Sequence, residues 1–205
     1  MTEASPLQFV PTLPPEEVAR ANFYGLLARL FYAPPDATLL QALAASNEVE
    51  AEGEDDGFAE AWQALAAAAR QADPEAVREE YDRAFVGTGK APVTPYTCAY
   101  TIKVSNDVPL VRLRAELADL GLGRKEGVHE PEDHIAALCD VMRHLIAEQK
   151  RELEDQRAFF ESWIWPAAAP LCNAIEKSET TDFYKRVAAV LHALCTIEHK
   201  AFEML

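Results

Sequence analysis

The chain has 205 residues, of which 49% are hydrophobic and 26% are charged, and its formal net charge is −15. That charge argues against a nucleic-acid binder, because an acidic surface repels phosphates, but it is compatible with a basic partner or with solubility alone. Alanine-rich runs and only 8 glycines favour helix over sheet. We therefore expect residues 1–205 to form a single all-α domain of about eight to ten helices.

The beginning of the sequence and its cysteines bear on the compartment. Residues 1–13 are rich in proline and lack the basic start and apolar stretch of a secretory signal, so we expect an irregular arm. No run reaches the roughly 18 apolar residues of a membrane span. The four cysteines form no CxxC pair, and three lie in apolar helical patterns, as reduced buried thiols do. The sequence therefore predicts a soluble, cytoplasmic protein.

Clear start signals mark the first two helices. Prolines and glutamates over 14–17 open the first helix, which ends before Pro34 because proline restricts the residue in front of it. Asp36 is the expected N-cap of a short second helix. The acidic residues 47–57 are expected to form a solvated loop. The first helix should bury one face made of Val18, Ala21, Phe23, Leu26, Leu27, Leu30 and Phe31.

The next two helices lead into a long irregular stretch. Phe58 begins the third helix, and the Asp-Pro-Glu signal at 73–75 starts a fourth that runs to Phe85. Residues 87–96 interrupt helix repeatedly, which is typical of either a functional loop or a long connection. The Gly-Lys pair in this stretch suggests a P-loop, but Ala91 follows it where that motif needs Ser or Thr for magnesium. We therefore reject the P-loop interpretation.

The second half of the sequence predicts further helices. One opens at Pro109 and ends near Gly121, and another runs from Pro131 to about Gln149. The apolar pattern from Leu153 onward continues past two prolines, at 166 and 170, which should kink or split that helix. Thr180, Thr181 and Asp182 are the expected cap of the last helix. Its core face should consist of Phe183, Val187, Val190, Leu191, Leu194 and Ile197.

The EPEDH segment, residues 130–134, carries more polar groups than a helix start requires. Its acidic side chains suit the positive end of a helix dipole, and helical spacing would place Glu130 and His134 on one side of the turn, beside Asp133. A carboxylate neighbour would help keep His134 protonated. The segment is thus either a cap or a small acidic pocket for an arginine or backbone amine of a peptide.

A metal-dependent helical enzyme is the main alternative, with His129, Glu130 and His134 as its ligands. The sequence contains no HExxH motif, no second His or Cys group at ligand-like spacing and no other catalytic signature. An acidic helical adaptor is a further alternative. We expect no enzymatic activity, no metal and no cofactor.

Several motifs in the sequence resemble the TorD/DmsD/NarJ-type redox-enzyme maturation chaperones. The EPEDH segment with Leu138 and Met142 is similar to the family's E-P-x-D-H-x-x-x-x-L-x-x-M signature. Residues 26–36 look like its first helix, and residues 81–87 look like its Y-x-x-L-F-x-G segment. Pro95 and Tyr96 with Tyr100 are similar to its P-[YW]-x-S-x-[YW] loop, and residues 183–184 match its F-Y start of the last helix.

The resemblance implies an all-helical, non-enzymatic chaperone that exists as a monomer or a helix-swapped dimer. Members of this family bind the twin-arginine signal, or the apo-form, of a molybdenum-enzyme catalytic subunit until the cofactor is inserted and the subunit is exported. An acidic surface with aromatic side chains suits such a basic, partly apolar peptide. Asp133 would contact a guanidinium, and Tyr32 and Tyr96 would supply stacking contact. The full set of implied peptide-binding residues is Tyr32, Phe85, Pro95, Tyr96, Glu130, Asp133 and His134.

Overall fold

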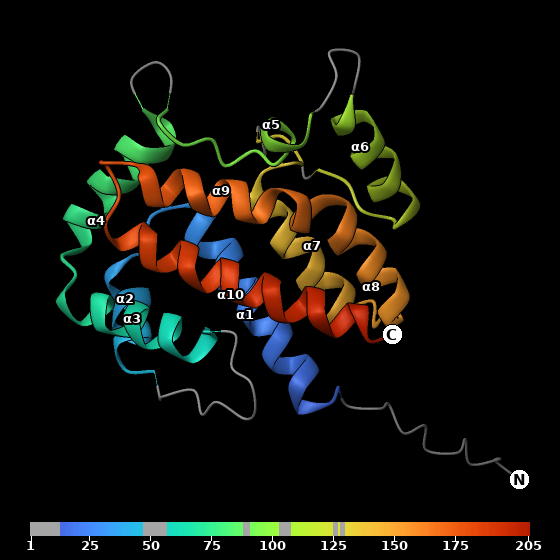
Figure 1. Ribbon diagram of the computed structural model, residues 1–205, viewed down its shortest axis with the longest axis horizontal. Helices are drawn as coiled ribbons and strands as arrows, with labels where there is room; N and C mark the ends of the chain where they lie inside the picture. Colours follow the sequence, from blue (N-terminus) through green and yellow to red (C-terminus); the bar gives the residue numbers. More distant parts are fainter. Residues whose placement is uncertain (1–12, 47–56, 88–90, 103–107, 125–126, 128–129) are drawn as a thin grey trace, which may run out of the picture.

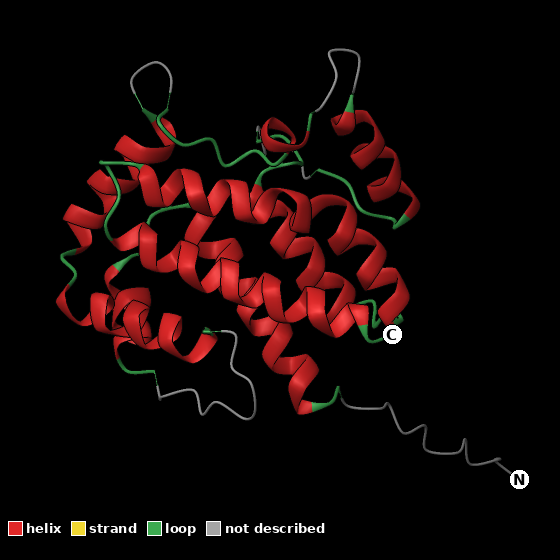
Figure 2. Cartoon of the chain, in the orientation of Figure 1, coloured by secondary structure: helices red, strands yellow, loops and turns green. Residues whose placement is uncertain are grey.

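The computed structural model describes residues 13–46, 57–87, 91–102, 108–124, 127 and 130–205. Within these ranges the chain forms helices α1 to α10 and no β-strand, which confirms the all-α prediction (Figures 1 and 2). The arm expected over 1–13 and the acidic loop expected over 47–57 lie almost entirely outside the described residues, as does His129.

The first four helices begin where local signals predict. They are α1 (Pro15–Tyr32), α2 (Ala37–Ala44), α3 (Phe58–Gln71) and α4 (Pro74–Tyr81). The Asp36 carboxylate accepts a bond from the Leu39 N–H at 2.8 Å, which confirms it as the N-cap of α2. The α4 helix continues into a π-helical turn, η1 (Asp82–Val86), so the predicted helix through Phe85 changes its winding after Tyr81.

The middle of the chain differs most from prediction. It contains α5 (Cys98–Thr101), which was not predicted, α6 (Pro109–Asp119) and α7 (Ile135–Ala147). The predicted start of α7 at Pro131 is wrong, because the backbone before Ile135 bonds to another segment instead of forming a helical turn. The Thr97 N–H donates to the Asp133 carbonyl at 2.8 Å, and the Ile135 N–H donates to the Pro95 carbonyl at 2.9 Å.

The last third of the chain is one interrupted helix followed by a long one. Helix α8 (Leu153–Phe159) passes through a π-helical turn, η2 (Phe160–Ile164), into α9 (Trp165–Lys177). Pro166 lies in the first turn of α9, where a missing N–H costs little, and Pro170 lies inside α9. The predicted splitting of this helix is confirmed. The long α10 (Phe183–Glu203) completes the fold.

A shared apolar core joins these helices. Helix α1 packs along α7, while α10 lies against α3 and α9 (Figure 1). All four cysteines are buried and free, as predicted. Two expected core positions are wrong: Val18 is 42% exposed and Ile197 is 37% exposed, because each lies at the solvent edge of its helix face. The largest fully buried side chains include Tyr24, Leu27, Leu30, Phe31, Leu65, Leu138, Met142, Phe159, Phe160 and Tyr184.

The N-terminus of α10 is capped by a residue from another helix. The buried Glu80 carboxylate of α4 accepts bonds from the N–H groups of Asp182 at 2.9 Å, Phe183 at 3.1 Å and Tyr184 at 2.8 Å. The predicted cap at 180–182 is therefore wrong, since Asp182 forms no side-chain cap bond. Thr181 instead donates to the Ile175 carbonyl near the end of α9, at 2.6 Å.

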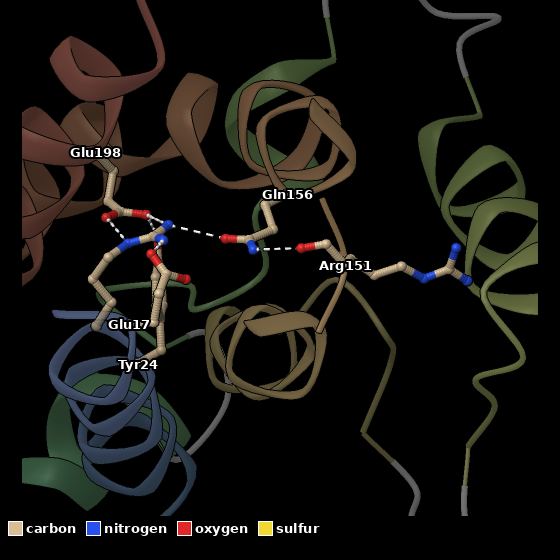
Figure 3. A network of polar contacts seen from close by, with 6 residues as sticks. Glu17, Tyr24, Arg151, Gln156 and Glu198 are labelled. Atoms are coloured by element: carbon tan, nitrogen blue, oxygen red, sulfur yellow. Dashed lines mark hydrogen bonds and ion pairs between the residues drawn. The ribbon is translucent and has the colours of Figure 1, made fainter. Parts of the chain in front are cut away.

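A buried polar network ties α1 to α8 and α10 (Figure 3). The Arg20 guanidinium donates to both oxygens of Glu198 at 2.7 Å, to Glu17 at 2.6 Å and to the Gln156 side-chain oxygen at 3.1 Å. The Tyr24 hydroxyl also donates to Glu198, at 3.2 Å. Burial acts to lower the pKa of Arg20, but the bonds from Glu198 and Glu17 outweigh it and raise that pKa.

Candidate functional site

The three carboxylates of the EPEDH segment face three different parts of the molecule. Glu130 accepts a bond from the Tyr96 hydroxyl at 2.5 Å and is exposed. Glu132 accepts bonds from two arginines, at 114 and 124. Asp133 is only 5% exposed, and its carboxylate accepts a bond from the Cys98 N–H at 3.3 Å, at the start of α5. The segment therefore combines one solvent-facing carboxylate with two that hold structure.

Backbone bonds fix this segment against the loop before α5. Tyr96 and His134 form an isolated antiparallel β-bridge, flanked by the two backbone bonds from Thr97 and Ile135. Pro95 and Asp133 are buried within this frame. In Figure 1, α5 accordingly lies beside the start of α7. The helical spacing expected for Glu130 and His134 is wrong, because both residues precede the helix.

His134 is the N-cap of α7. It is 5% exposed, and its Nδ1 accepts a bond from the Ala136 N–H at 3.1 Å, which requires that nitrogen to carry no proton. Burial lowers the pKa of His134 and outweighs the charges of Glu130 and Asp133, which act to raise it. The expectation that the carboxylates keep His134 protonated is therefore wrong. Its ring meets the Tyr96 ring edge-on, with centroids 5.3 Å apart.

The lowered pKa of His134 predicts a loss of stability in mild acid. Below its ordinary pKa of 6.5 the unfolded chain binds a proton that folded His134 does not, so the free energy of unfolding should fall as pH drops from about 7 to 5. In His134→Asn, whose side-chain oxygen can also accept the Ala136 N–H, this part of the pH dependence should disappear. Urea unfolding at several pH values measures both slopes. Equal slopes would assign the pH dependence to other groups.

Tyrosine side chains surround the exposed Glu130 carboxylate. The bond to Glu130 is the main cause that raises the pKa of Tyr96 to about 12. Burial, followed by the charge of Glu130, raises the pKa of Tyr81 to about 12. The Tyr81 hydroxyl donates to the Tyr32 carbonyl at 3.0 Å, and the Tyr32 side chain is 59% exposed. Of the predicted residues, Tyr32, Tyr96 and Glu130 thus come together around Tyr81.

Phe85 supports this surface from beneath. It is 8% exposed, and its ring lies 5.3 Å from that of Tyr81 and 5.0 Å from that of Tyr184, measured between centroids. Phe31 completes the aromatic cluster, 6.2 Å from Phe85. Tyr81 was not among the predicted site residues, although it begins the 81–87 segment that carries the family resemblance. That position was the signal that could have identified it.

Neither a metal site nor a membrane helix is found in the described part of the chain. Among those residues, no group of three or more His, Cys, Asp or Glu side chains could hold a metal ion. Of the proposed metal ligands, Glu130 bonds to Tyr96 and His134 bonds to Ala136. No helix formed by those residues is both long enough and apolar enough to cross a membrane.

Comparison with known proteins identifies relatives. Residues 51–173 match the family described as nitrate reductase delta subunit. The chain is 28% identical over 129 residues to the chaperone protein TorD of Photobacterium profundum, and 29% identical over 129 residues to that of Vibrio parahaemolyticus. Each alignment covers 56% of this chain and 58% of the relative, so the chain spans little more than half the length of these relatives.

A solved structure shares the fold. It is the crystal structure of a redox enzyme maturation protein from Archaeoglobus fulgidus, with a TM-score of 0.53. The match covers 92% of this chain and 97% of that protein. At 18% sequence identity, this likeness concerns the fold alone.

Proposed function

Because the chain belongs to the nitrate reductase delta subunit family, we propose that it is a non-enzymatic assembly chaperone for a molybdenum-dependent oxidoreductase. In this proposal it binds the twin-arginine signal or the apo-form of the client's catalytic subunit in the cytoplasm. Binding then lasts until the cofactor is inserted and the subunit is exported. The names of the TorD relatives support the chaperone assignment.

The observation that carries the proposal is the exposed Glu130 carboxylate between aromatic side chains. Tyr96 holds one of its oxygens at 2.5 Å, and a planar guanidinium can approach this carboxylate from solvent. The ring of Tyr32, 59% exposed, offers a surface for stacking or apolar contact. Phe85 supports these rings from the core. A basic peptide with an apolar stretch matches both features, and the chain's net charge of −15 favours its approach.

The buried members of the predicted site receive a different role. Pro95, Asp133 and His134 hold the backbone frame that positions Tyr96 and Glu130, and their side chains are largely covered. The proposal therefore assigns the peptide guanidinium to Glu130 in the first place. Asp133 contributes by fixing α5, through its bond to the Cys98 N–H.

Neutralising Glu130 is expected to weaken peptide binding. Glu130→Gln removes the charge but keeps an acceptor for the Tyr96 hydroxyl, so affinity for a peptide with two adjacent arginines should fall roughly fivefold. Fluorescence anisotropy with a labelled synthetic peptide measures the change. Affinity should also fall with added salt, because screening weakens attraction between opposite charges.

Glu60→Gln is the matched control for this experiment. Glu60 is an exposed residue in the first turn of α3, and the substitution removes the same charge outside the site. Its affinity should remain close to that of the unaltered protein. Equal losses in the two variants would show that only net charge matters, and would remove Glu130 from the site.

A further inference from the structure

Glu132 is already bound by two arginines of the chain itself. Arg114 Nε donates to Oε2 of Glu132 at 2.9 Å, while Arg124 donates to Oε1 through Nη2 at 2.8 Å and Nε at 3.1 Å. Burial acts to raise the pKa of Glu132, but the bonds from Arg124 and Arg114 outweigh it and lower that pKa. The carboxylate is therefore charged at neutral pH, and both of its oxygens are occupied.

These internal bonds have the chemistry expected of a bound basic peptide. Two guanidiniums converge on one carboxylate, two residues from the exposed Glu130. The Glu132 side chain is only 14% exposed, whereas those of Arg114 and Arg124 are 48% and 34% exposed. Ion pairs with such solvent access are weak, so a competing guanidinium from solution can exchange with them.

We propose that Arg114 and Arg124 are specificity-determining residues that act as internal competitors for the carboxylates of the EPEDH segment. A basic client segment meets Glu130 first, and it reaches Glu132 only by displacing an arginine of the chain. This inference rests on the proposed function, since it concerns the same site. It assigns to the site a preference for clients that present two guanidiniums, because a single one gains only Glu130.

The fold allows these arginines to be replaced without loss of α6. Helix α6 is also held by the buried side chains of Leu113 and Leu117. In addition, the Trp163 ring N–H donates to Glu116 of α6 at 2.7 Å. Arg114 and Arg124 themselves bond to Glu132 at the surface, so their removal leaves the core contacts of α6 in place.

The test is a double variant, Arg114→Gln with Arg124→Gln. Its affinity for the labelled peptide with two adjacent arginines should rise roughly two- to fivefold, the range expected when competing surface ion pairs are removed. A peptide in which one arginine is replaced by alanine should gain less. Adding Glu132→Gln to the double variant should abolish the gain, because the freed carboxylate is then absent.

Arg143→Gln with Arg151→Gln is the matched control. It changes the net charge equally and removes two arginines that pair with acidic residues elsewhere on the surface. An equal gain in this control, or no gain in the double variant, would overturn the inference. If the unaltered protein does not bind the two-arginine peptide at all, the proposed function fails instead, so the two failures are distinguishable.

Discussion

Glu80→Ala is expected to lower the free energy of unfolding by about 3 kcal/mol, although Glu80 lies far in sequence from the helix that it caps. The substitution removes the acceptor of three backbone N–H groups at the start of α10. Loss of an N-cap alone costs about 0.5–2 kcal/mol, and bonds to a charged acceptor add to this, because the freed groups of Phe183 and Tyr184 are buried. For a chain of this length, the melting temperature should fall by about 6–12 °C.

Glu79→Ala provides the comparison for Glu80. Glu79 is the preceding residue of α4 and is exposed, so its removal should change the free energy of unfolding by less than about 0.5 kcal/mol. Glu80→Gln keeps one acceptor oxygen and should fall between the two. Thermal and urea unfolding measure all three variants. Similar losses for Glu79→Ala and Glu80→Ala would contradict the capping role.

Glu198→Ala is expected to cost about 3–5 kcal/mol, because it leaves the Arg20 guanidinium largely buried without its main partner. The side chains of Glu198 and Arg20 are 3% and 19% exposed. Replacing both members with apolar residues, Arg20→Met and Glu198→Leu, should recover most of this loss, since no uncompensated charge remains. Urea unfolding measures each variant and the interaction between them.

Glu203→Ala is the matched control for the buried pair. Glu203 also lies on α10, but its side chain is 64% exposed, so the free energy of unfolding should change little. If the apolar double variant is no more stable than Glu198→Ala, the loss comes from packing or from Tyr24, which also bonds to Glu198. That outcome would contradict the proposed cause.

Features of the fold that depend on neighbouring residues were predictable. Asp36 caps α2, Pro74 opens α4, and Gly121 adopts the positive φ expected after α6. Each of these signals acts within a few residues and needs no knowledge of the tertiary structure. The family was also identified from local motifs, and the match over residues 51–173 confirms it.

Features that depend on distant contacts were not predictable. The cap of α10 comes from Glu80, about a hundred residues earlier, so no local pattern indicates it. The start of α7 is shifted to Ile135 because the residues before it pair with the loop around Thr97. The same pairing buries Asp133, which the sequence suggested as an exposed partner for a guanidinium.

The candidate site was only partly accessible to sequence reasoning. Tyr32, Tyr96 and Glu130 were named from their motifs, and they come together in the structure. The role of Tyr81 as their link could not be inferred, because it depends on a hydroxyl that reaches the end of α1. Likewise, nothing in the sequence pairs Glu132 with Arg114 on a separate helix.

The β-bridge between Tyr96 and His134 bears on how such a protein can diversify. The bonds from Thr97 to Asp133 and from Ile135 to Pro95 join main-chain atoms only. Substitution of the side chains at 96 and 130 therefore leaves the scaffold that presents them intact. Selection, or a combinatorial library restricted to these two positions, can alter which peptides are accepted without first having to rebuild the fold.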